Sequence, residues 1–546
     1  MSDIFDYVII GAGSAGCVLA NRLSADPAIR VCLIEAGPPN RSPYIHVPLG
    51  MVKLTHHKIL GWQDQTVAQK DAAGRSIPMP HGRTLGGSSS INGMVYMRGH
   101  PRDYDEWAAA GNPGWSYRDV LPYFRRSEHN EQWAGSEFHG AGGPLNVRDP
   151  SALNPMVKVL FEATDSLQLP RNADFNGAQQ EGFGLRQITQ RKGRRESTAT
   201  AFLNPVKRRP NLRIMTSVVA NRILFDGRRA TGVELAFEST QHIVMARREI
   251  IVAAGAISSP LLLLRSGIGD AEALRQRGIA VTHHLPGVGG NLQDHVAVGI
   301  KVSSPSSLPY GLTIGKLPRI ALSAIEYLLL RRGLFASNVM QAGGFVRTEP
   351  SLDRPDIQYS FMPALRNASG GIAWGHGYTL STFLLRPRSR GTVGLAAGDV
   401  RQPAIDPRFF SAADDIEVLL RGLKLARRIL AAPAFDKYRG KELMPGAGVQ
   451  SDDQLKDFIR KTSATAFHPV GTCRMGNDVE AVVDAQLRVR GVEGLRVVDA
   501  SVMPTIIGGN TNAPVIMIAE KASDMILGKP PLAADRKGRA DVREIA

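Results

Sequence analysis

Residues 5–37 read FDYVIIGAGSAGCVLANRLSADPAIRVCLIEAG, and this stretch decides the fold. It predicts an apolar strand over 7–10, a glycine turn, a helix over 15–23 and a second apolar strand over 31–36. A strand, a helix and a strand in this order form a βαβ unit, which belongs to a sheet with parallel strands. The sequence therefore predicts an α/β fold at the start of the chain.

The spacing of the glycines in this stretch predicts a dinucleotide site. Gly11 permits the tight turn, Gly13 lets the backbone approach a pyrophosphate, and Gly16 lets the helix pack against the strand. The positive end of the helix then faces the phosphates. Glu35 lies about 20 residues beyond Gly16, where an acid binds the ribose hydroxyls. Its charge would repel the additional phosphate of NADP, whereas NAD and FAD both remain open.

Size and composition indicate a globular protein with more than one domain or one large composite unit. The chain has 546 residues, of which 43% are hydrophobic and 21% charged. The three cysteines, Cys17, Cys32 and Cys473, fit neither a disulfide framework nor a metal knuckle. The histidine pairs at 56–57 and 283–284 have no companion carboxylate or cysteine spacing. We therefore expect surface histidines and no metal site.

The sequence predicts a cytoplasmic protein. The N-terminal segment MSDIFDYVIIGAG lacks the basic region and cleavage site of a secretion signal, and few cysteines suit a reducing compartment. No apolar stretch reaches the roughly 18 residues needed to span a bilayer. The segment IALSAIEYLLLRRG at 320–333 is interrupted by Glu326, and we expect it to be a helix packed on the domain. The alternative is an amphipathic helix on an anionic membrane surface, because the formal net charge is +16.

The basic excess does not indicate nucleic acid binding. Arginine and lysine are scattered along the chain, aromatic residues make up only 6%, and no recognition module is present. Residues 529–546 are rich in proline, alanine and charge without an apolar period. This composition predicts a mobile tail.

A second glycine-rich stretch, HGRTLGGSSSINGMVYMRG at 81–99, has neither a helical nor a strand period. The N–H groups freed at Gly86 and Gly87, and the hydroxyls of Ser88 and Ser89, suit further phosphate contacts. Asn92 is placed to reach a ring edge. A plain surface loop is the alternative on composition alone.

The sequence in the middle of the chain predicts further strands of the same sheet. β-Branched runs at 211–235, divided by Asp-Gly, indicate a hairpin. Residues 249–269, EIIVAAGAISSPLLLLRSGIG, repeat the order of strand, glycine and helix. In this second unit we expect Ser258 or Ser259 to cap the helix and Pro260 to lie in its first turn.

Several motifs in one order resemble the glucose-methanol-choline (GMC) family of flavin oxidoreductases over residues 4–528. They are GAGSAG with Glu35, GRTLGGSSSINGMVYMRG, GAISSPLLLLRSGIG, GVGGNLQDH at 287–295, HPVGTCRMG at 468–476, and RVVDASVMPTIIGGNTNAP at 496–514. The resemblance implies FAD as cofactor and an alcohol as substrate. RVCLIEAGP and SNVMQAGGFVR are most similar to bacterial dehydrogenases of aliphatic primary alcohols, which are membrane-associated.

The family fold implies an α/β FAD-binding Rossmann-like domain with an α+β substrate domain built on an antiparallel sheet. Short strands such as DIQYSFMPAL and TLSTFLLRP, with a helical stretch at 414–430, agree with the second domain. We expect a discontinuous FAD-binding domain over 1–160, 212–298 and 463–528, a substrate-binding domain over 161–211 and 299–462, and the tail over 529–546.

The segment TAFHPVGTCRMG at 465–476 contains a candidate base, His468. A histidine with a pKa near 6.5 is able to accept a hydroxyl proton close to neutral pH. On the residues alone, a structural histidine before proline is the more common alternative. The resemblance places His468 at the family's first catalytic position and Asn510 at the second. An asparagine is no base, but its amide can hold and polarise the substrate oxygen.

The resemblance and the glycine motifs together imply the FAD contacts. We expect a helix that starts at Pro514 and points its N-terminus at the flavin ring. Members with covalently bound flavin carry a histidine where this chain has Ile91, so we expect noncovalent FAD. The expected cofactor-binding residues are Gly11, Gly13, Ser14, Ala15, Gly16, Glu35, Ala36, Trp62, Arg83, Gly86, Gly87, Ser88, Asn92, Gly93, Met94, Val95, Ala220, Asp499, Ala500, Thr511, Asn512 and Pro514.

Two departures bear on the substrate. Choline-oxidising relatives carry a glutamate and a histidine where this chain has Gln341 and Ser360, so the carboxylate that offsets a trimethylammonium ion is missing. The expected cavity residues are Met340, Gln341, Ser360, Phe361 and Met362. We therefore expect an uncharged aliphatic or aryl primary alcohol, oxidised to the aldehyde with the proton passing to His468 and the hydride to flavin.

The resemblance favours a quinone or respiratory-chain electron acceptor and allows a peripheral position on the inner face of the membrane. The alternatives are a choline dehydrogenase-like enzyme, an alcohol oxidase that uses oxygen, and a lyase or noncatalytic flavin protein of the same fold. An NAD-dependent dehydrogenase would not need the other motifs that follow the first glycine cluster.

Overall fold

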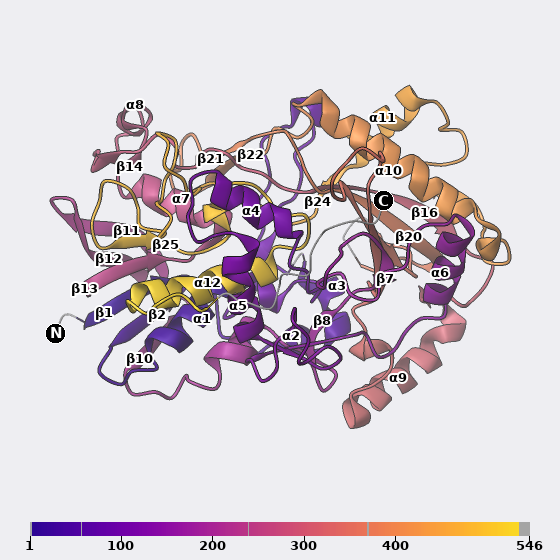
Figure 1. The fold of residues 1–546 in the computed structure, drawn as a ribbon, viewed down its shortest axis with the longest axis horizontal. Helices are drawn as coiled ribbons and strands as arrows, with labels where there is room; N and C mark the ends of the chain where they lie inside the picture. The colour runs from indigo at the N-terminus through magenta and orange to yellow at the C-terminus, as the bar shows by residue number, and fades with distance from the viewer. Residues whose placement is uncertain (1–2, 56, 238–239, 368–370, 534–546) are drawn as a thin grey trace.

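The computed structural model describes residues 3–55, 57–237, 240–367 and 371–533. Two large sheets lie side by side, each with its own helices (Figure 1). The arrangement confirms the predicted combination of an α/β unit with an antiparallel α+β unit. The predicted mobile tail lies outside the described residues from residue 534 onward.

The first sheet has the strand order β10-β2-β1-β13-β12-β11, with β25 beside β13. β1 pairs in parallel with β2 and β13, as the βαβ prediction requires, and β11 and β12 form the predicted antiparallel hairpin. The strands are β1 (Asp3–Ile10), β2 (Val31–Glu35), β10 (Leu212–Thr216), β11 (Val219–Asp226), β12 (Arg229–Phe237), β13 (Thr240–Val252) and β25 (Leu495–Val497).

Helix α1 (Ser14–Leu23) connects β1 to β2 and packs against α12 (Asn512–Ile526), so the two ends of the described chain meet in one core (Figure 1). The contact between turn and helix depends on Gly16. A Cβ at this position would lie 1.8 Å from the Gly11 carbonyl oxygen, which no side chain could occupy. α12 begins at Asn512, two residues before the predicted start at Pro514.

The second sheet has the order β23-β16-β20-β19-β18-β7, and all of these neighbours pair antiparallel. Two short strands, β17 (Gly311–Leu312) and β24 (Ala464–Thr465), join it beside β20 and β16. The main strands are β7 (Gly182–Leu185), β16 (Val296–Ser303), β18 (Ala342–Val346), β19 (Ile357–Met362), β20 (Gly375–Leu384) and β23 (Glu442–Met444).

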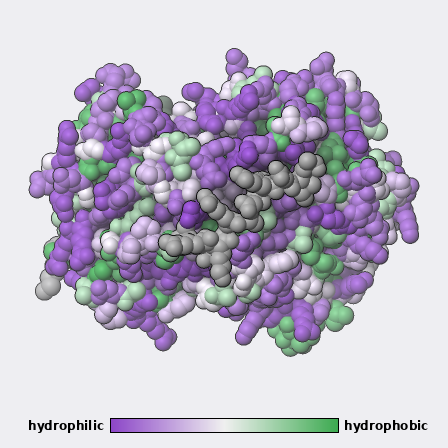
Figure 2. Space-filling view, in the orientation of Figure 1, coloured by the Kyte–Doolittle hydropathy of each residue, from purple (hydrophilic) through white to green (hydrophobic). Residues whose placement is uncertain are grey.

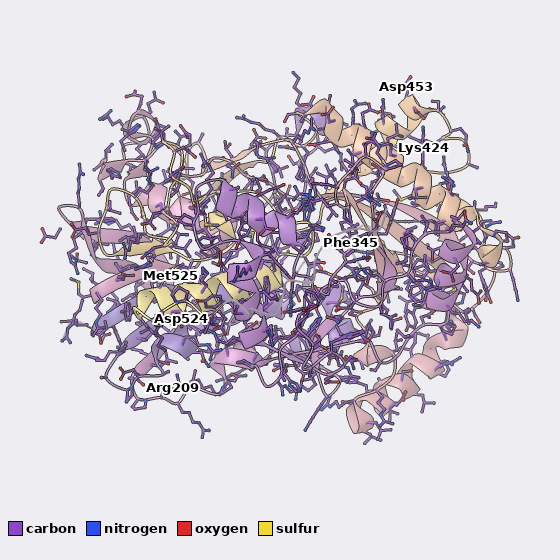
Figure 3. All side chains as sticks on the ribbon, in the orientation of Figure 1. Arg209, Phe345, Lys424, Asp453, Asp524 and Met525 are labelled. Carbon is purple, nitrogen blue, oxygen red and sulfur yellow. The ribbon has the colours of Figure 1, made fainter. Side chains whose placement is uncertain are left out.

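Helix α10 (Ala413–Ala431) covers one face of the second sheet and contacts α6 (Met156–Ser166) and α11 (Asp452–Thr462). The hydroxyl of Tyr359 on β19 donates 2.7 Å to the Gly422 carbonyl of α10, so this face of the sheet is closed. Lys424 and Asp453 extend from the outer side of these helices (Figure 3). The opposite face of the sheet is therefore the one available to a ligand.

The predicted domain boundaries stay a prediction, but one segment packs differently from its assignment. Residues 199–203, placed by the sequence in the substrate-binding domain, form the π-helix η4 (Ala199–Leu203). η4 packs against α1 in the core of the first sheet. Its apolar side chains therefore belong to the same core as α1 and α12.

The predicted start of the helix after β13 was wrong. α7 (Gly255–Arg265) begins before the serines, and Pro260 lies inside it. The carboxylate of Asp499 takes the capping role, because its Oδ2 accepts from the Gly255 N–H at 2.9 Å. Pro260 leaves the Ala256 carbonyl without its helical donor, and the Thr472 hydroxyl donates to it at 2.6 Å. Both compensations come from distant parts of the chain.

Helix α9 (Leu317–Leu330) also departs from expectation, since it does not pack on the domain as a buried helix. Tyr327 is the one buried residue of α9, all of which the structure describes, while Leu322 is 65% and Leu329 76% exposed. In Figure 2, hydrophobic side chains gather at the lower right, where Figure 1 draws α9. Among the described residues, no helix has the length and apolar character to cross a bilayer.

Candidate active site

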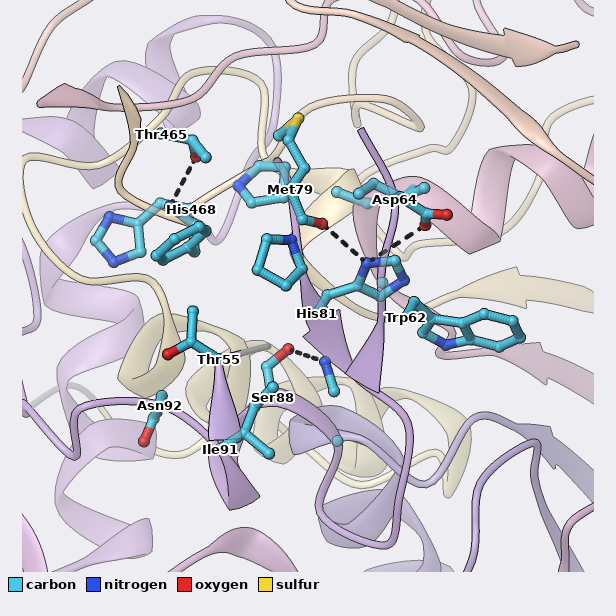
Figure 4. A pocket seen from close by; sticks show the side chains of 18 of the residues that line it. Thr55, Trp62, Asp64, Met79, His81, Ser88, Ile91, Asn92, Thr465 and His468 are labelled. Atoms are coloured by element: carbon cyan, nitrogen blue, oxygen red, sulfur yellow. Dashed lines mark hydrogen bonds and ion pairs between the residues drawn. The ribbon is translucent and has the colours of Figure 1, made fainter. Parts of the chain in front are cut away.

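One cavity of about 1290 Å³ joins the glycine turn after β1 to the open face of the second sheet. His468 and Asn510 line this cavity, as do Met340 and Ser360. Figure 4 shows His468, Ile91 and Asn92 around one part of it, with Trp62 and His81 farther along. The predicted cofactor residues that line it are Gly11, Gly13, Ser14, Ala15, Glu35, Ala36, Trp62, Arg83, Gly87, Ser88, Asn92, Gly93, Val95, Ala220, Asp499, Ala500, Thr511 and Asn512.

Four predicted cofactor residues do not line the cavity. Gly16 packs against the turn at Gly11, and the Gly86 N–H donates 2.7 Å to the Ala12 carbonyl. Met94 is fully buried, and Pro514 lies in the first turn of α12. They lie behind the lining residues, so direct contact with a ligand is not expected of them.

The residues at the glycine turn fit a dinucleotide. The two carboxylate oxygens of Glu35 accept from the Ala12 N–H at 2.9 Å and the Gly37 N–H at 2.8 Å, which fixes the side chain at the cavity wall. Burial raises the pKa of Glu35 to about 7. A Cβ on Gly87 would come within 2.7 Å of Gly13 Cα, so the two glycine turns close on each other. The backbone N–H groups between the two turns remain available to bind a phosphate.

Farther along, the cavity offers groups for a flavin. The Arg83 guanidinium lies 4.6 Å from the centre of the Trp62 ring, and its Nε has no partner among the described residues. Asn92 accepts from the Met94 N–H and from Arg195, which leaves its amide N–H groups for a ligand. This donor set fits FAD, with the ribose at Glu35, the phosphates at the glycine turns and the ring system toward His468.

The backbone around His468 is held by one buried carboxylate. Asp294 Oδ1 accepts from the His468 N–H at 2.9 Å, and Asp294 Oδ2 accepts from the Thr465 hydroxyl. The Thr465 hydroxyl in turn accepts from the Phe467 N–H at 2.8 Å, and Phe467 adopts a left-handed φ of 64°. Burial raises the pKa of Asp294 to about 7. This turn presents the imidazole to the cavity.

A chain of hydrogen bonds assigns the protons on His468. The Leu385 carbonyl can only accept, so His295 Nε2, at 3.1 Å, carries a hydrogen. Burial lowers the pKa of His295 to about 3, so its ring is neutral and its Nδ1 is bare. His468 Nδ1, 3.0 Å away, must then donate to it. His468 Nε2 is therefore left with a lone pair.

That lone pair is available near neutral pH. Burial, followed by the nearby His295 and Arg186, holds the pKa of His468 well below its usual range. The ring is therefore neutral, and His468 Nε2 can accept a proton without first losing one. This arrangement is what general-base chemistry requires.

Asn510 lies beside the lone pair in a fixed orientation. Its Nδ2 is 3.0 Å from His468 Nε2 and donates to it. Its Oδ1 accepts from Arg186 and from Gln358, each at 3.4 Å. An alcohol oxygen that displaces this direct hydrogen bond would accept from the Asn510 amide and donate to His468 Nε2. The pair can thus hold a hydroxyl group.

Three predicted substrate residues lie outside the cavity wall. Residues of a strand alternate between faces, so Ser360 points to the cavity and Phe361 to the core under α10. Met362 packs in a separate apolar cluster with Val339. Gln341 is 1% exposed and holds the loop before α6, where its Oε1 accepts from the Asn154 N–H.

The structure adds residues that the sequence did not single out. His295 and its neighbour Asp294 lie in the quoted motif at 287–295 but had no predicted role. Arg186 follows β7 in a stretch without any motif, so no sequence signal pointed to it. Within the described residues, no three His, Cys, Asp or Glu side chains form a metal-binding group, and His56 lies outside those residues.

Comparison with known proteins gives the family of the chain. Two family models described as GMC oxidoreductase match residues 5–297 and 387–519. The chain is 46% identical to an alcohol dehydrogenase [acceptor] from Pseudomonas putida, with 97% of each chain covered. It is 41% identical to an oxygen-dependent choline dehydrogenase from Photobacterium profundum, with 97% of this chain and 94% of the relative covered.

A solved structure shares the fold. A formate oxidase variant from Aspergillus oryzae RIB40, solved to follow FAD modification, superposes with a TM-score of 0.89 at 27% identity, covering 96% of this chain and 98% of that one. The two family models together span most of the chain, and the donor set of the cavity fits FAD. The chain therefore belongs to the GMC oxidoreductase family, and it is an FAD-dependent oxidoreductase that acts on CH–OH donors.

Proposed function

We propose that the protein oxidises a primary alcohol without positive charge to the aldehyde. The observation that carries this proposal is the bare Nε2 of His468 facing the Asn510 amide at 3.0 Å in the cavity wall. The alcohol oxygen accepts from Asn510 Nδ2 and donates its proton to His468 Nε2. FAD, when bound, supplies the acceptor for the hydride that leaves the carbinol carbon.

The cavity disfavours a cationic alcohol such as choline. Ser360 on β19 replaces a histidine of choline-oxidising relatives, and the Arg186 guanidinium donates to its hydroxyl at 2.5 Å. A trimethylammonium ion would therefore meet a positive charge that no carboxylate pairs with. The uncharged alkyl and aryl alcohols expected from the sequence satisfy this condition.

We propose noncovalent FAD. Ile91, at the position of the flavin-linked histidine in other members, lines the cavity and packs against Ile45, Leu54 and Leu60. An aliphatic side chain offers no atom for a bond to the flavin.

Anaerobic mixing of the purified holoprotein with a panel of alcohols tests the function. Uncharged primary alcohols are expected to bleach the flavin absorbance and to yield one aldehyde per flavin, because each oxidation delivers two electrons to one FAD. Choline serves as the cationic control and is expected to bleach it far more slowly. If choline reduces the flavin as fast as the uncharged primary alcohols do, or if none of these alcohols reduces it, the proposed substrate class is wrong.

We propose that the electrons pass to a quinone-type acceptor, as the resemblance to acceptor-linked alcohol dehydrogenases favours. Aerobic turnover with a soluble quinone should then exceed turnover with oxygen alone. Hydrogen peroxide formed one-to-one with aldehyde would instead identify an oxidase.

We further propose that α9 contacts the inner face of the membrane. Its exposed leucines are joined by four basic residues, Lys316, Arg319, Arg331 and Arg332, against the single acid Glu326. An apolar helix face edged with arginine and lysine fits an anionic lipid surface. A quinone dissolved in that bilayer would then be close to the enzyme.

Replacing Leu328 and Leu329 together by serine is expected to weaken binding to phosphatidylglycerol-containing vesicles roughly tenfold or more, because each leucine loses the gain from burial in lipid. These side chains are 67% and 76% exposed, so the fold should tolerate the change. Co-sedimentation measures the partition. Val479→Ser, at a residue 79% exposed and away from α9, is the matched control.

Equal sedimentation of the double variant and the wild type would contradict the membrane contact. If α9 instead covers a second copy of the chain, the wild type would be a dimer without vesicles and the double variant a monomer.

A further inference from the structure

Arg186 is a charged side chain of the cavity wall near His468 that the reaction does not use directly. Arg186 follows β7, and its N–H donates 2.9 Å to the Gln341 carbonyl on the neighbouring chain segment. Its side chain crosses to Ser360 and Asn510 and lines the cavity, with 3% of the residue exposed. The Asn510 amide thus lies between Arg186 and the base His468.

No carboxylate neutralises this guanidinium. Among the described residues, no Asp or Glu oxygen lies within the 4.0 Å of an ion pair with Arg186, and its Nε has no hydrogen-bond partner. Its two contacts are the Ser360 hydroxyl and a long bond of 3.4 Å to Asn510 Oδ1. Burial lowers the pKa of Arg186 to about 10, so it is still charged at neutral pH.

Other buried arginines show how this chain usually satisfies such a charge. Arg98 pairs with the buried carboxylate of Glu128 at 2.7 Å. Arg195 has no carboxylate either, but it donates to the carbonyls of Ile45 and Ser89 and to Asn92 Oδ1. Arg186 has fewer acceptors than either, and it alone of the three reaches Asn510. Burying a guanidinium with so few acceptors lowers the stability of the fold unless a ligand supplies the missing hydrogen-bond acceptors.

We propose that Arg186 binds a carboxylate of the substrate, so that the preferred alcohols are hydroxy acids whose carboxylate lies a few bonds from the CH–OH carbon. This inference rests on the proposed alcohol oxidation, and it names a negatively charged substrate class in place of the uncharged alcohols expected from the sequence. An oxygen held between His468 and Asn510 places the rest of the substrate in the same cavity as the Arg186 guanidinium. Two carboxylate oxygens match the forked N–H groups of an arginine that lines the cavity.

The experiment compares 3-(hydroxymethyl)benzoate with its methyl ester, which has the same ring and carbinol but no charge. In the wild-type holoenzyme, kcat/KM for the acid is expected to exceed that for the ester about tenfold or more, mainly through KM. In Arg186→Met this ratio should fall toward one, whereas Arg186→Lys should keep part of it. The ratio cancels any effect of the variant on Asn510 that both substrates share.

Two further readouts separate this inference from a purely structural role of Arg186. Benzoate, which cannot be oxidised, should shift the flavin absorbance of the holoenzyme, and Arg186→Met should weaken its binding about tenfold. The acid limb of the pH profile of kcat/KM for the ester should move to higher pH in Arg186→Met, because the charge that lowers the pKa of His468 is gone.

The outcomes distinguish the two proposals. If the ester reduces the flavin as well as or better than the acid in the wild type, the carboxylate site is overturned and alcohol oxidation stands. If neither substrate reduces it, alcohol oxidation fails, and benzoate binding still decides the site. Absence of benzoate binding by the wild type, or equal binding by Arg186→Met, overturns the inference even if that variant folds poorly in other assays.

Discussion

Replacement of His468 by alanine is expected to slow the reduction of the flavin by an alcohol about 10²–10⁴-fold. The alanine leaves no group to accept the hydroxyl proton, since the facing Asn510 amide only donates to that oxygen. Anaerobic stopped-flow measurement of the flavin absorbance gives the rate for each variant at saturating alcohol.

The control for this variant is His284→Ala, which removes an exposed imidazole on β15 (His283–His284) that does not line the cavity. It should reduce at the wild-type rate. Both variants should hold FAD in the same ratio and be reduced by dithionite at equal rates, because neither residue lies at the glycine turns. Turnover of His468→Ala within a few-fold of wild type would show that another group removes the proton.

The sequence predicted the fold correctly where a local residue pattern fixes the backbone geometry. The turn between β1 and α1 is an example, because the close approach of Gly16 to the Gly11 carbonyl leaves room for no other residue. The start of α7 was not readable, since Asp499 and Thr472 supply its cap and its missing donor from more than two hundred residues away. Capping rules consider only residues next to the helix end, so they cannot predict such partners.

The candidate site likewise has residues that the sequence predicted and residues that it did not. His468 and Asn510 lie in motifs and were predicted, while Arg186 lies in a stretch without a motif. Its importance comes from β7 lying at the edge of the second sheet, beside β18, which turns one arginine toward the cavity. The orientation of Phe361 away from the cavity likewise depends on the register of β19, which apolar composition alone did not reveal.

Replacing His295 by leucine is expected to lower kcat about 10-fold to 10²-fold while KM for an alcohol stays nearly unchanged. The leucine removes the acceptor for the His468 Nδ1 hydrogen, 3.0 Å away. A buried N–H without an acceptor costs about 1–3 kcal/mol, and about 1.4 kcal/mol changes a population tenfold. His468 then favours the tautomer with hydrogen on Nε2, which cannot accept the substrate proton.

Asparagine at position 295 separates this positioning role from simple packing. The Oδ1 of His295→Asn takes the place of the ring Nδ1 and accepts from His468, so most of the wild-type kcat should return even though the bond to the Leu385 carbonyl is lost. A packing role predicts the opposite order, because leucine fills the apolar part of the imidazole volume better than asparagine does. Steady-state kinetics of the two variants, at matched FAD content and matched Tm, decide between these orders. Equal kcat for the two variants would mean that the proton on His468 is not assigned through His295.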